Sequence, residues 1–210
     1  MMPTIVLPSA YLAPVQYYAR LYAHPQALVE VHDHYLKQTY RNRCMVAGPN
    51  GVQALTVPIV KPDRVKTPLC DIRISDHGNW QHLHWNALLS NYERSPFFDY
   101  YADELRPFFE KKFDFLADFN EEIQRVVLTA LDLQPQFQRT EQYADLAPGV
   151  PDLRQIISPK VSLDHDPDFR IQPYYQVFAH KHGFLPNLSI VDLLFNMGPE
   201  ARLVLRKSLG

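Results

Sequence analysis

The first 31 residues contain two short apolar runs on either side of a stretch with helical periodicity. Residues 4–7 and 27–31 have the composition of β-strands, and residues 15–22 between them place apolar side chains on one stripe. A strand, a helix and a strand within about 28 residues predict a right-handed βαβ unit, because parallel strands need a crossover connection. This opening constrains the fold more than any other feature, since it requires a parallel sheet.

The chain then changes from strand-like to helical patterns. Residues 44–47 and 53–60 flank the turn Gly-Pro-Asn-Gly at 48–51, and together they predict a β-hairpin. Residues 70–75 alternate apolar and polar side chains, which predicts a further strand. From Asn79 onward the period is helical and predicts three helices, at residues 79–92, 96–112 and 114–133.

The last third of the chain has a different character. Residues 134–182 are rich in proline and have no strong period, which predicts an extended arm that wraps the rest of the chain, and residues 189–195 predict a final helix. The expected fold is therefore mixed α/β: a small, mostly β N-terminal half opening with a βαβ unit and a hairpin, a helical half, and an irregular C-terminal arm ending in a helix. We expect one domain over residues 1–210, made of an α/β part (1–76), a helical part (77–133) and the proline-rich arm with its helix (134–210).

Composition excludes several classes of protein. The formal charge of −2 disfavours a nucleic-acid-binding protein, and any site for an anion must be local. No run of residues is long and apolar enough for a membrane span, and the N-terminus lacks the features of a signal peptide. Two cysteines fit a reducing compartment, so we expect a soluble cytoplasmic protein. With 18 prolines, seven glycines and no glycine-rich phosphate motif, the sequence indicates no particular cofactor.

The segment from Glu30 to Arg43 is unusually polar and directly follows a predicted strand, where α/β proteins place their binding groups. Arg41 and Arg43 flank Asn42, and in an extended segment both guanidiniums lie on one side, where they can clamp a phosphate or carboxylate. Lys37 adds a third cation. The alternative is a solvated basic loop in which these cations pair with Glu30 and Asp33.

Histidines recur in this chain with one residue between them, and His32 and His34 form the first such pair. In a strand, both would lie on one face, where they could bind a metal ion or supply a general base. No set of histidine, cysteine and acidic residues has a recognised metal-ligand spacing, so no metal is predicted. Asp192, inside the apolar final helix, either stands near its N-terminus or pairs with an arginine of the polar segment.

Several blocks of sequence together resemble the WbqC-like family of bacterial proteins. The blocks are Leu7-Pro-Ser-Ala-Tyr-Leu-Ala-Pro14, Lys37 with Arg41-Asn42-Arg43, Leu55-Thr-Val-Pro58, Ser95-Pro-Phe-Phe98, and the ending Phe184-Leu-Pro-Asn-Leu-Ser-Ile-Val-Asp-Leu-Leu-Phe-Asn-Met-Gly198. The chain departs from the family pattern in three places. It has Leu7 where the family usually has Gln, it has histidines in place of an acid pair after the second strand, and it lacks a glycine-rich stretch before the last block.

The resemblance implies a role with O-antigen or other surface-polysaccharide genes. By analogy, the protein is expected to be a transferase acting on an activated sugar or an acyl or aminoacyl donor. Its partner would be an anionic small molecule such as a nucleotide-sugar, and whether the chain forms a homo-oligomer stays open. The alternative is a non-catalytic protein of the same pathway that binds an anionic metabolite or takes part in assembly, and a metal-dependent hydrolase ranks last.

The enzyme hypothesis assigns a role to each candidate residue. The predicted catalytic group contains His34 and His32 as bases and Asp192, which positions an arginine. The predicted ligand-binding group holds phosphates and orients the substrate, and its members are Lys37, Tyr40, Arg41, Asn42 and Arg43. The shared family pattern includes the cations but not the histidines, so the cations are the stronger prediction.

Overall fold

The computed structural model describes residues 5–64 and 66–210. Strands β1 (Ile5–Pro8), β2 (Gln26–Glu30) and β5 (Gln136–Arg139) form a parallel sheet in the order β1-β2-β5. Helix α1 (Val15–Ala23) connects β1 to β2, so the predicted βαβ unit is confirmed. Thr4, the first residue of the predicted strand, lies outside the described residues.

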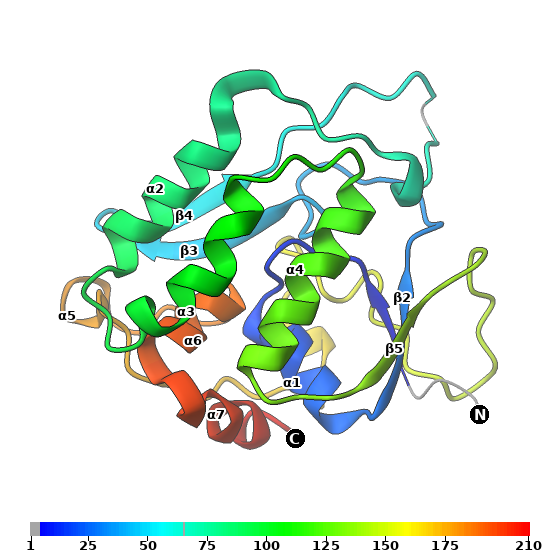
Figure 1. Cartoon of the computed structure of the whole chain (residues 1–210). Helices are drawn as coiled ribbons and strands as arrows, with labels where there is room; N and C mark the ends of the chain where they lie inside the picture. Colours follow the sequence, from blue (N-terminus) through cyan, green and yellow to red (C-terminus); the bar gives the residue numbers. More distant parts are fainter. Residues whose placement is uncertain (1–4, 65) are drawn as a thin grey trace.

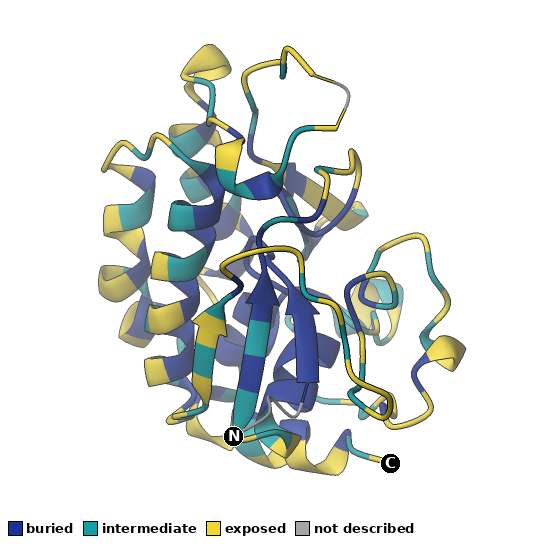
Figure 2. Cartoon of the chain, turned by 90° about the vertical axis from the view of Figure 1, so that its right-hand side faces the viewer, coloured by how far each residue is buried: buried dark blue, intermediate teal, exposed yellow. Residues whose placement is uncertain are grey.

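The C-terminal arm extends this sheet past β1. Asp152 forms a parallel bridge with Val6, and Leu153 donates its backbone N–H to the carbonyl of Val6 at 2.9 Å. Four stretches of chain therefore run parallel to one another, and β1 and β2 are the two inner strands of the extended sheet. Figure 2 shows the arrows of β1, β2 and β5 pointing the same way, with β5 as the exposed edge of the sheet.

The predicted hairpin is also confirmed. Strands β3 (Arg43–Gly48) and β4 (Gly51–Thr56) pair antiparallel around a two-residue turn, and Gly51 after the turn has a φ of 102°. β4 ends four residues earlier than predicted. Beyond the hairpin, Figure 1 shows α2 (Trp80–Tyr92), α3 (Phe98–Leu105) and α4 (Leu116–Ala130) in turn along the green part of the chain.

Two predictions for the middle of the chain are wrong. Residues 70–75 form no strand, because the chain takes a 3₁₀ turn at η1 (Leu69–Asp71) and then pairs only through isolated bridges at Arg73 and Ile74. The single helix predicted over 96–112 is two elements, α3 and the 3₁₀ helix η3 (Arg106–Phe109). Pro107 explains the break, since proline has no N–H to donate within a helix.

The C-terminal arm has more regular structure than its composition indicates. It begins with β5, and the predicted final helix is confirmed as α6 (Ile190–Met197). A further helix, α7 (Ala201–Lys207), was not predicted. Gly198 separates the two helices with a φ of 53°, and a Cβ there would lie 2.5 Å from the ring of Phe97. The short elements are η2 (His77–Asn79), η4 (Leu163–His165), α5 (Ala179–His182) and η5 (Gly198–Glu200).

Helices pack against the parallel sheet and join it to the main core. α4 packs on the sheet through Ala117, which contacts a small buried cluster containing Val29 and Val31. α1 contacts α6 and α7, and the main core includes side chains from both ends of the chain. No helix in the described part of the chain has the length and hydrophobicity needed to cross a membrane.

Candidate functional site

The candidate site lies at the carboxyl edge of the parallel sheet. Parallel strands end at a common edge, and polar groups placed just after each strand meet there. Glu30 ends β2, Thr140 follows β5, and Arg154 follows the bridge beside β1. These three residues are far apart in the sequence but are hydrogen-bonded neighbours in the structure.

Glu30 is fully buried, and its carboxylate accepts four hydrogen bonds. Oε1 accepts from the Thr140 hydroxyl at 2.9 Å and from the backbone N–H of His32 at 2.7 Å. Oε2 accepts from the backbone N–H of Ala144 at 2.9 Å and from Arg154 at 3.1 Å. Burial alone would raise the pKa of Glu30, but these hydrogen bonds outweigh it and hold the pKa below its usual value. Glu30 therefore ties the loops of the edge together as a permanent anion.

Arg154 connects this anion to the outer part of the site. Its guanidinium donates two hydrogen bonds to Asp152, at 2.9 and 2.8 Å, and lies 4.5 Å from the centre of the Tyr143 ring. Hydrogen bonds to Asp152 raise the pKa of Arg154 further above its usual value. The ring of Tyr143 remains half exposed, so it presents a fixed aromatic face beside the site.

A cavity of about 530 Å³ opens at this edge, and we call it the carboxyl-edge cavity. Its lining residues are His32, Asp33, His34, Leu36, Tyr143 and Gln155. His32 is held by the carbonyl of Thr140, 3.0 Å from Nε2, and its Nδ1 lies 3.7 Å from the Cys70 sulfur. A hydrogen bond from Nε2 to the carbonyl makes Nδ1 the acceptor nitrogen of the neutral ring, and the Cys70 thiol lies within reach to donate to it. Burial, and then the nearby Asp71, raise the pKa of the Cys70 thiol.

Asp33 is a buried member of this lining. One carboxylate oxygen, Oδ2, forms an ion pair with Arg41. The other, Oδ1, has no hydrogen-bond partner among the described residues. Burial raises the pKa of Asp33, although Arg41 acts in the opposite direction. A buried polar atom without a partner typically costs about 1–3 kcal/mol, so this carboxylate can still gain a strong hydrogen bond.

The predicted ligand-binding residues separate into a buried group and an accessible group. Tyr40, Arg41 and Asn42 are all buried, and Asn42 donates to the carbonyl of Val57 at 2.8 Å. The pairing of Arg41 with Asp33 agrees with the alternative that the cations pair with the acids of their own segment. Arg43 is partly exposed and donates to Thr56 at 3.0 Å, and Lys37 is exposed. The two arginines therefore have different partners and do not share one clamp.

Of the predicted catalytic residues, the structure brings His32 and His34 together and holds Asp192 elsewhere. Asp192 is completely buried and accepts hydrogen bonds from Tyr92 at 2.8 Å, Tyr174 at 2.7 Å and Gln176 at 3.0 Å. The predicted pairing with an arginine is wrong, since these three donors are its side-chain partners in the described part of the chain. Burial raises the pKa of Asp192.

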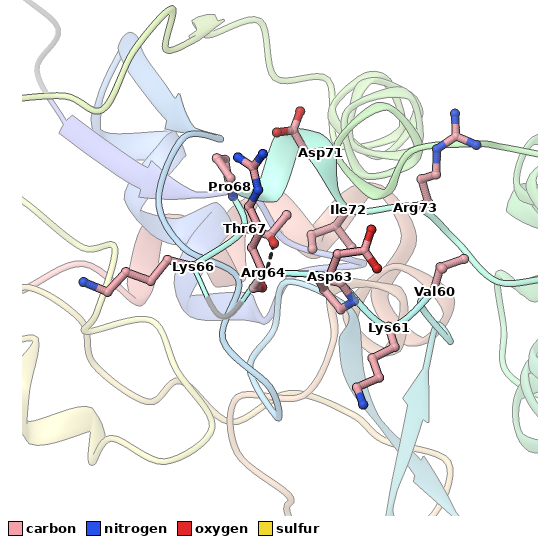
Figure 3. Close-up of a pocket in the computed structure, with 11 residues that line it drawn as sticks. Val60, Lys61, Asp63, Arg64, Lys66, Thr67, Pro68, Asp71, Ile72 and Arg73 are labelled. Atoms are coloured by element: carbon pink, nitrogen blue, oxygen red, sulfur yellow. Dashed lines mark hydrogen bonds between the residues drawn. The ribbon is translucent and has the colours of Figure 1, made fainter.

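A second cavity, of about 400 Å³, lies on the loop that precedes η1. We call it the basic-loop cavity, and residues of the segments 60–64, 66–68 and 71–73 line it. It carries two acids and four cations, which are Lys61, Arg64, Lys66 and Arg73. None of these cations forms an ion pair with another described residue. Figure 3 shows that these side chains spread in different directions from the loop, while Thr67 donates to the carbonyl of Arg64 at 2.9 Å.

The two cavities share a wall. Tyr35 donates its backbone N–H to the carbonyl of Thr67 at 3.0 Å, and Leu69 donates to the carbonyl of Asp33 at 3.0 Å. His34 forms an isolated bridge with Pro68 between these two bonds. The segment with His32 and His34 and the segment with the basic loop therefore run side by side. The first lines the carboxyl-edge cavity, and the second lines the basic-loop cavity.

Some residues of the site were missed by sequence reasoning. Asp33 was considered only as an ion-pair partner, and Tyr143 and Gln155 only as part of the arm. No local pattern marks the last two residues, because they reach the site through the pairing of the arm with β1 and β2. Within the described residues, no three histidine, cysteine or acidic side chains are grouped as a metal ion would require.

Comparison with known proteins identifies the class to which this fold and site belong. The model of the WbqC-like protein family matches residues 9–156, more than half of the chain, and the chain belongs to this family. It is similar to the uncharacterized protein Rv1507c of Mycobacterium tuberculosis (strain ATCC 25618 / H37Rv), with 27% identity over 195 residues, which cover 80% of this chain and 81% of the relative. No solved structure matches the chain.

Proposed function

We propose that the protein is a transferase of surface-polysaccharide biosynthesis that acts on an activated sugar or an acyl or aminoacyl donor. One observation carries this proposal: a cavity lined by two imidazoles and a carboxylate lies where the strands of a parallel sheet end. Ligands of open α/β sheets bind at this edge. The size of the cavity, about 530 Å³, suits a sugar ring and its substituents.

In this proposal, the exposed cations bind the anionic part of the donor. The basic-loop cavity provides cations that form no ion pair with another described residue, on the other side of the shared wall from the histidines. Lys37 and Arg43 remain candidates for the same task, because both are accessible. Tyr40, Arg41 and Asn42 act indirectly, by fixing the segment that carries the histidines.

His34 is the proposed general base. Its side chain is exposed at the cavity, where it can take the proton of a sugar amine or hydroxyl as that group attacks the donor. His32 is held by Thr140 and lines the same cavity, so it can accept a hydrogen bond from the attacking group. Asp192 has no part in this proposal, because neither it nor the tyrosines that donate to it line either cavity.

One observation favours the alternative, a binding protein without turnover. The His34 side chain has no hydrogen-bond partner among the described residues, whereas a general base is usually oriented by a third group. The same cavities would then hold a nucleotide-sugar or a related anionic metabolite for another protein.

A test of the enzyme hypothesis starts from a panel of nucleotide-sugars and acyl donors screened by thermal shift. With the ligands that stabilise the protein, His34→Ala is expected to lower turnover by about 10²–10⁴-fold and leave affinity nearly unchanged. His77→Ala, which alters an exposed histidine outside both cavities, serves as the control. Equal turnover in His34→Ala and the wild type would rule out His34 as the base. Binding without turnover in any of the proteins would favour the alternative.

A further inference from the structure

The two cavities differ in charge. Among the described residues that line the carboxyl-edge cavity, Asp33 is the one carboxylate and there is no lysine or arginine, whereas cations outnumber acids by four to two in the described lining of the basic-loop cavity. A phosphate therefore suits the basic loop and is disfavoured beside Asp33. The group that enters the carboxyl-edge cavity should instead be neutral or cationic, and it should donate hydrogen bonds.

Asp33 itself specifies this group more closely. It is only 6% exposed and lines the cavity, and its Oδ1 has no hydrogen-bond partner within the described part of the chain. Its other oxygen is already bound to Arg41, which fixes the carboxylate in place. Oδ1 is closed to solvent, so a ligand that donates an N–H or O–H from the cavity completes the coordination of this carboxylate once the neighbouring lining side chains shift to admit it.

Of the possible donors, an ammonium group fits best. Hydrogen bonds between two charged groups are stronger than those between neutral groups. His34, which has no hydrogen-bond partner among the described residues, adds an acceptor beside Asp33, and the Tyr143 ring adds an aromatic face that attracts cations. An N-acetyl group would remove the positive charge and add bulk at this point.

We propose that the carboxyl-edge cavity binds the free amino group of a phosphorylated amino sugar, with Asp33 as its principal acceptor. This inference rests on the proposed function, because it assumes that the ligand is an activated sugar whose phosphate binds at the basic loop. It makes Asp33 a specificity-determining residue and restricts the substrate class to sugars with an unmodified amine.

The test compares three matched probes by titration calorimetry with the wild-type protein: glucosamine 1-phosphate, N-acetylglucosamine 1-phosphate and glucose 1-phosphate. The amine is expected to bind at least about 10-fold more tightly than the N-acetyl compound, with the hydroxyl compound between them. In Asp33→Asn, the preference for the amine should fall below about 3-fold, since the amide carries no charge. Glu141→Gln, which removes an exposed carboxylate near Tyr143, should keep the full preference.

The outcomes separate this inference from the proposed function. Equal affinity for the amine and the N-acetyl compound overturns the inference and leaves the sugar-phosphate site in place. A preference that persists in Asp33→Asn overturns the role of Asp33. Binding of none of the three probes overturns the inference, and the thermal-shift panel of nucleotide-sugars and acyl donors then decides the proposed function separately. If Asp33→Asn does not fold, the comparison of probes with the wild type still decides whether an amine is selected.

Discussion

Replacing Arg154 with methionine is expected to lower the free energy of unfolding by about 3–5 kcal/mol. Methionine retains most of the bulk of the side chain but leaves Glu30, which is fully buried, without its cation. It also removes both hydrogen bonds to Asp152 and the contact with the Tyr143 ring. Urea unfolding at neutral pH, followed by circular dichroism, measures the change.

A second arginine offers a matched control. Arg139 also contacts two acids, Asp118 and Glu121, but about a third of its side chain is exposed. Arg139→Met should therefore cost only about 1 kcal/mol or less. Adding Glu30→Gln to Arg154→Met should recover part of the lost stability, because the amide leaves no uncompensated charge. Equal losses in the two single variants would contradict the central role given to the buried network.

Stability is expected to fall by about 3 kcal/mol as the pH drops from 6.5 to about 4, because of His84. Burial lowers the pKa of His84 from 6.5 to about 4. Its Nδ1 lies 3.0 Å from the hydroxyl of Tyr11, which donates to a neutral imidazole. The unfolded chain takes up a proton near pH 6.5 and the folded protein resists it, so the stabilising contribution is complete above pH 6.5 and is lost as the pH falls.

Urea unfolding at intervals between pH 7 and pH 5 checks the first part of this loss, which is about 2 kcal/mol. In this window the contribution of Glu30 is constant, since its folded pKa is lowered and its protonation matters only at more acidic pH. His84→Gln should flatten the pH dependence, even if it lowers stability at every pH. His82→Gln, two residues away on the exposed side of the same helix, should leave it unchanged. A steep dependence that survives in His84→Gln would refute the assignment.

The elements that the sequence predicted well are those with a clear local signal. β1 and β2 are short apolar runs that become inner strands, α1 has its apolar residues at helical spacing, and the hairpin has a turn followed by glycine, so local pattern and final environment agree. β5 was missed because its sequence, Gln-Phe-Gln-Arg, is polar at an edge of the sheet. Residues 70–75 alternate for another reason, since they pass between the segments around Ile59 and Phe115 and form one isolated bridge with each.

For the candidate site, the sequence drew attention to the segment after β2 but not to most of the residues that line the cavity there. The polar segment after β2 does line a cavity, as its position after a strand indicated. Arg41 and Asn42 were expected to face a ligand, yet both are buried, because the segment turns inward to meet Asp33 and Val57. Tyr143 and Arg154 could not be assigned from sequence, since their role depends on a strand pairing that only the folded chain defines.

The attachment of the arm to the first strands has a consequence for the order of folding. Arg154 lies 124 positions beyond Glu30 in the chain, and β5 pairs with β2 across a similar separation. During synthesis, the first 150 residues emerge before the partner of Glu30 exists, so the nascent chain contains a carboxylate that it cannot yet bury favourably. Such long-range closure is slow. The cavity should therefore be among the last parts of the molecule to form, and a nick in the loop between Thr140 and Pro151 should open it before the hairpin or α2 unfolds.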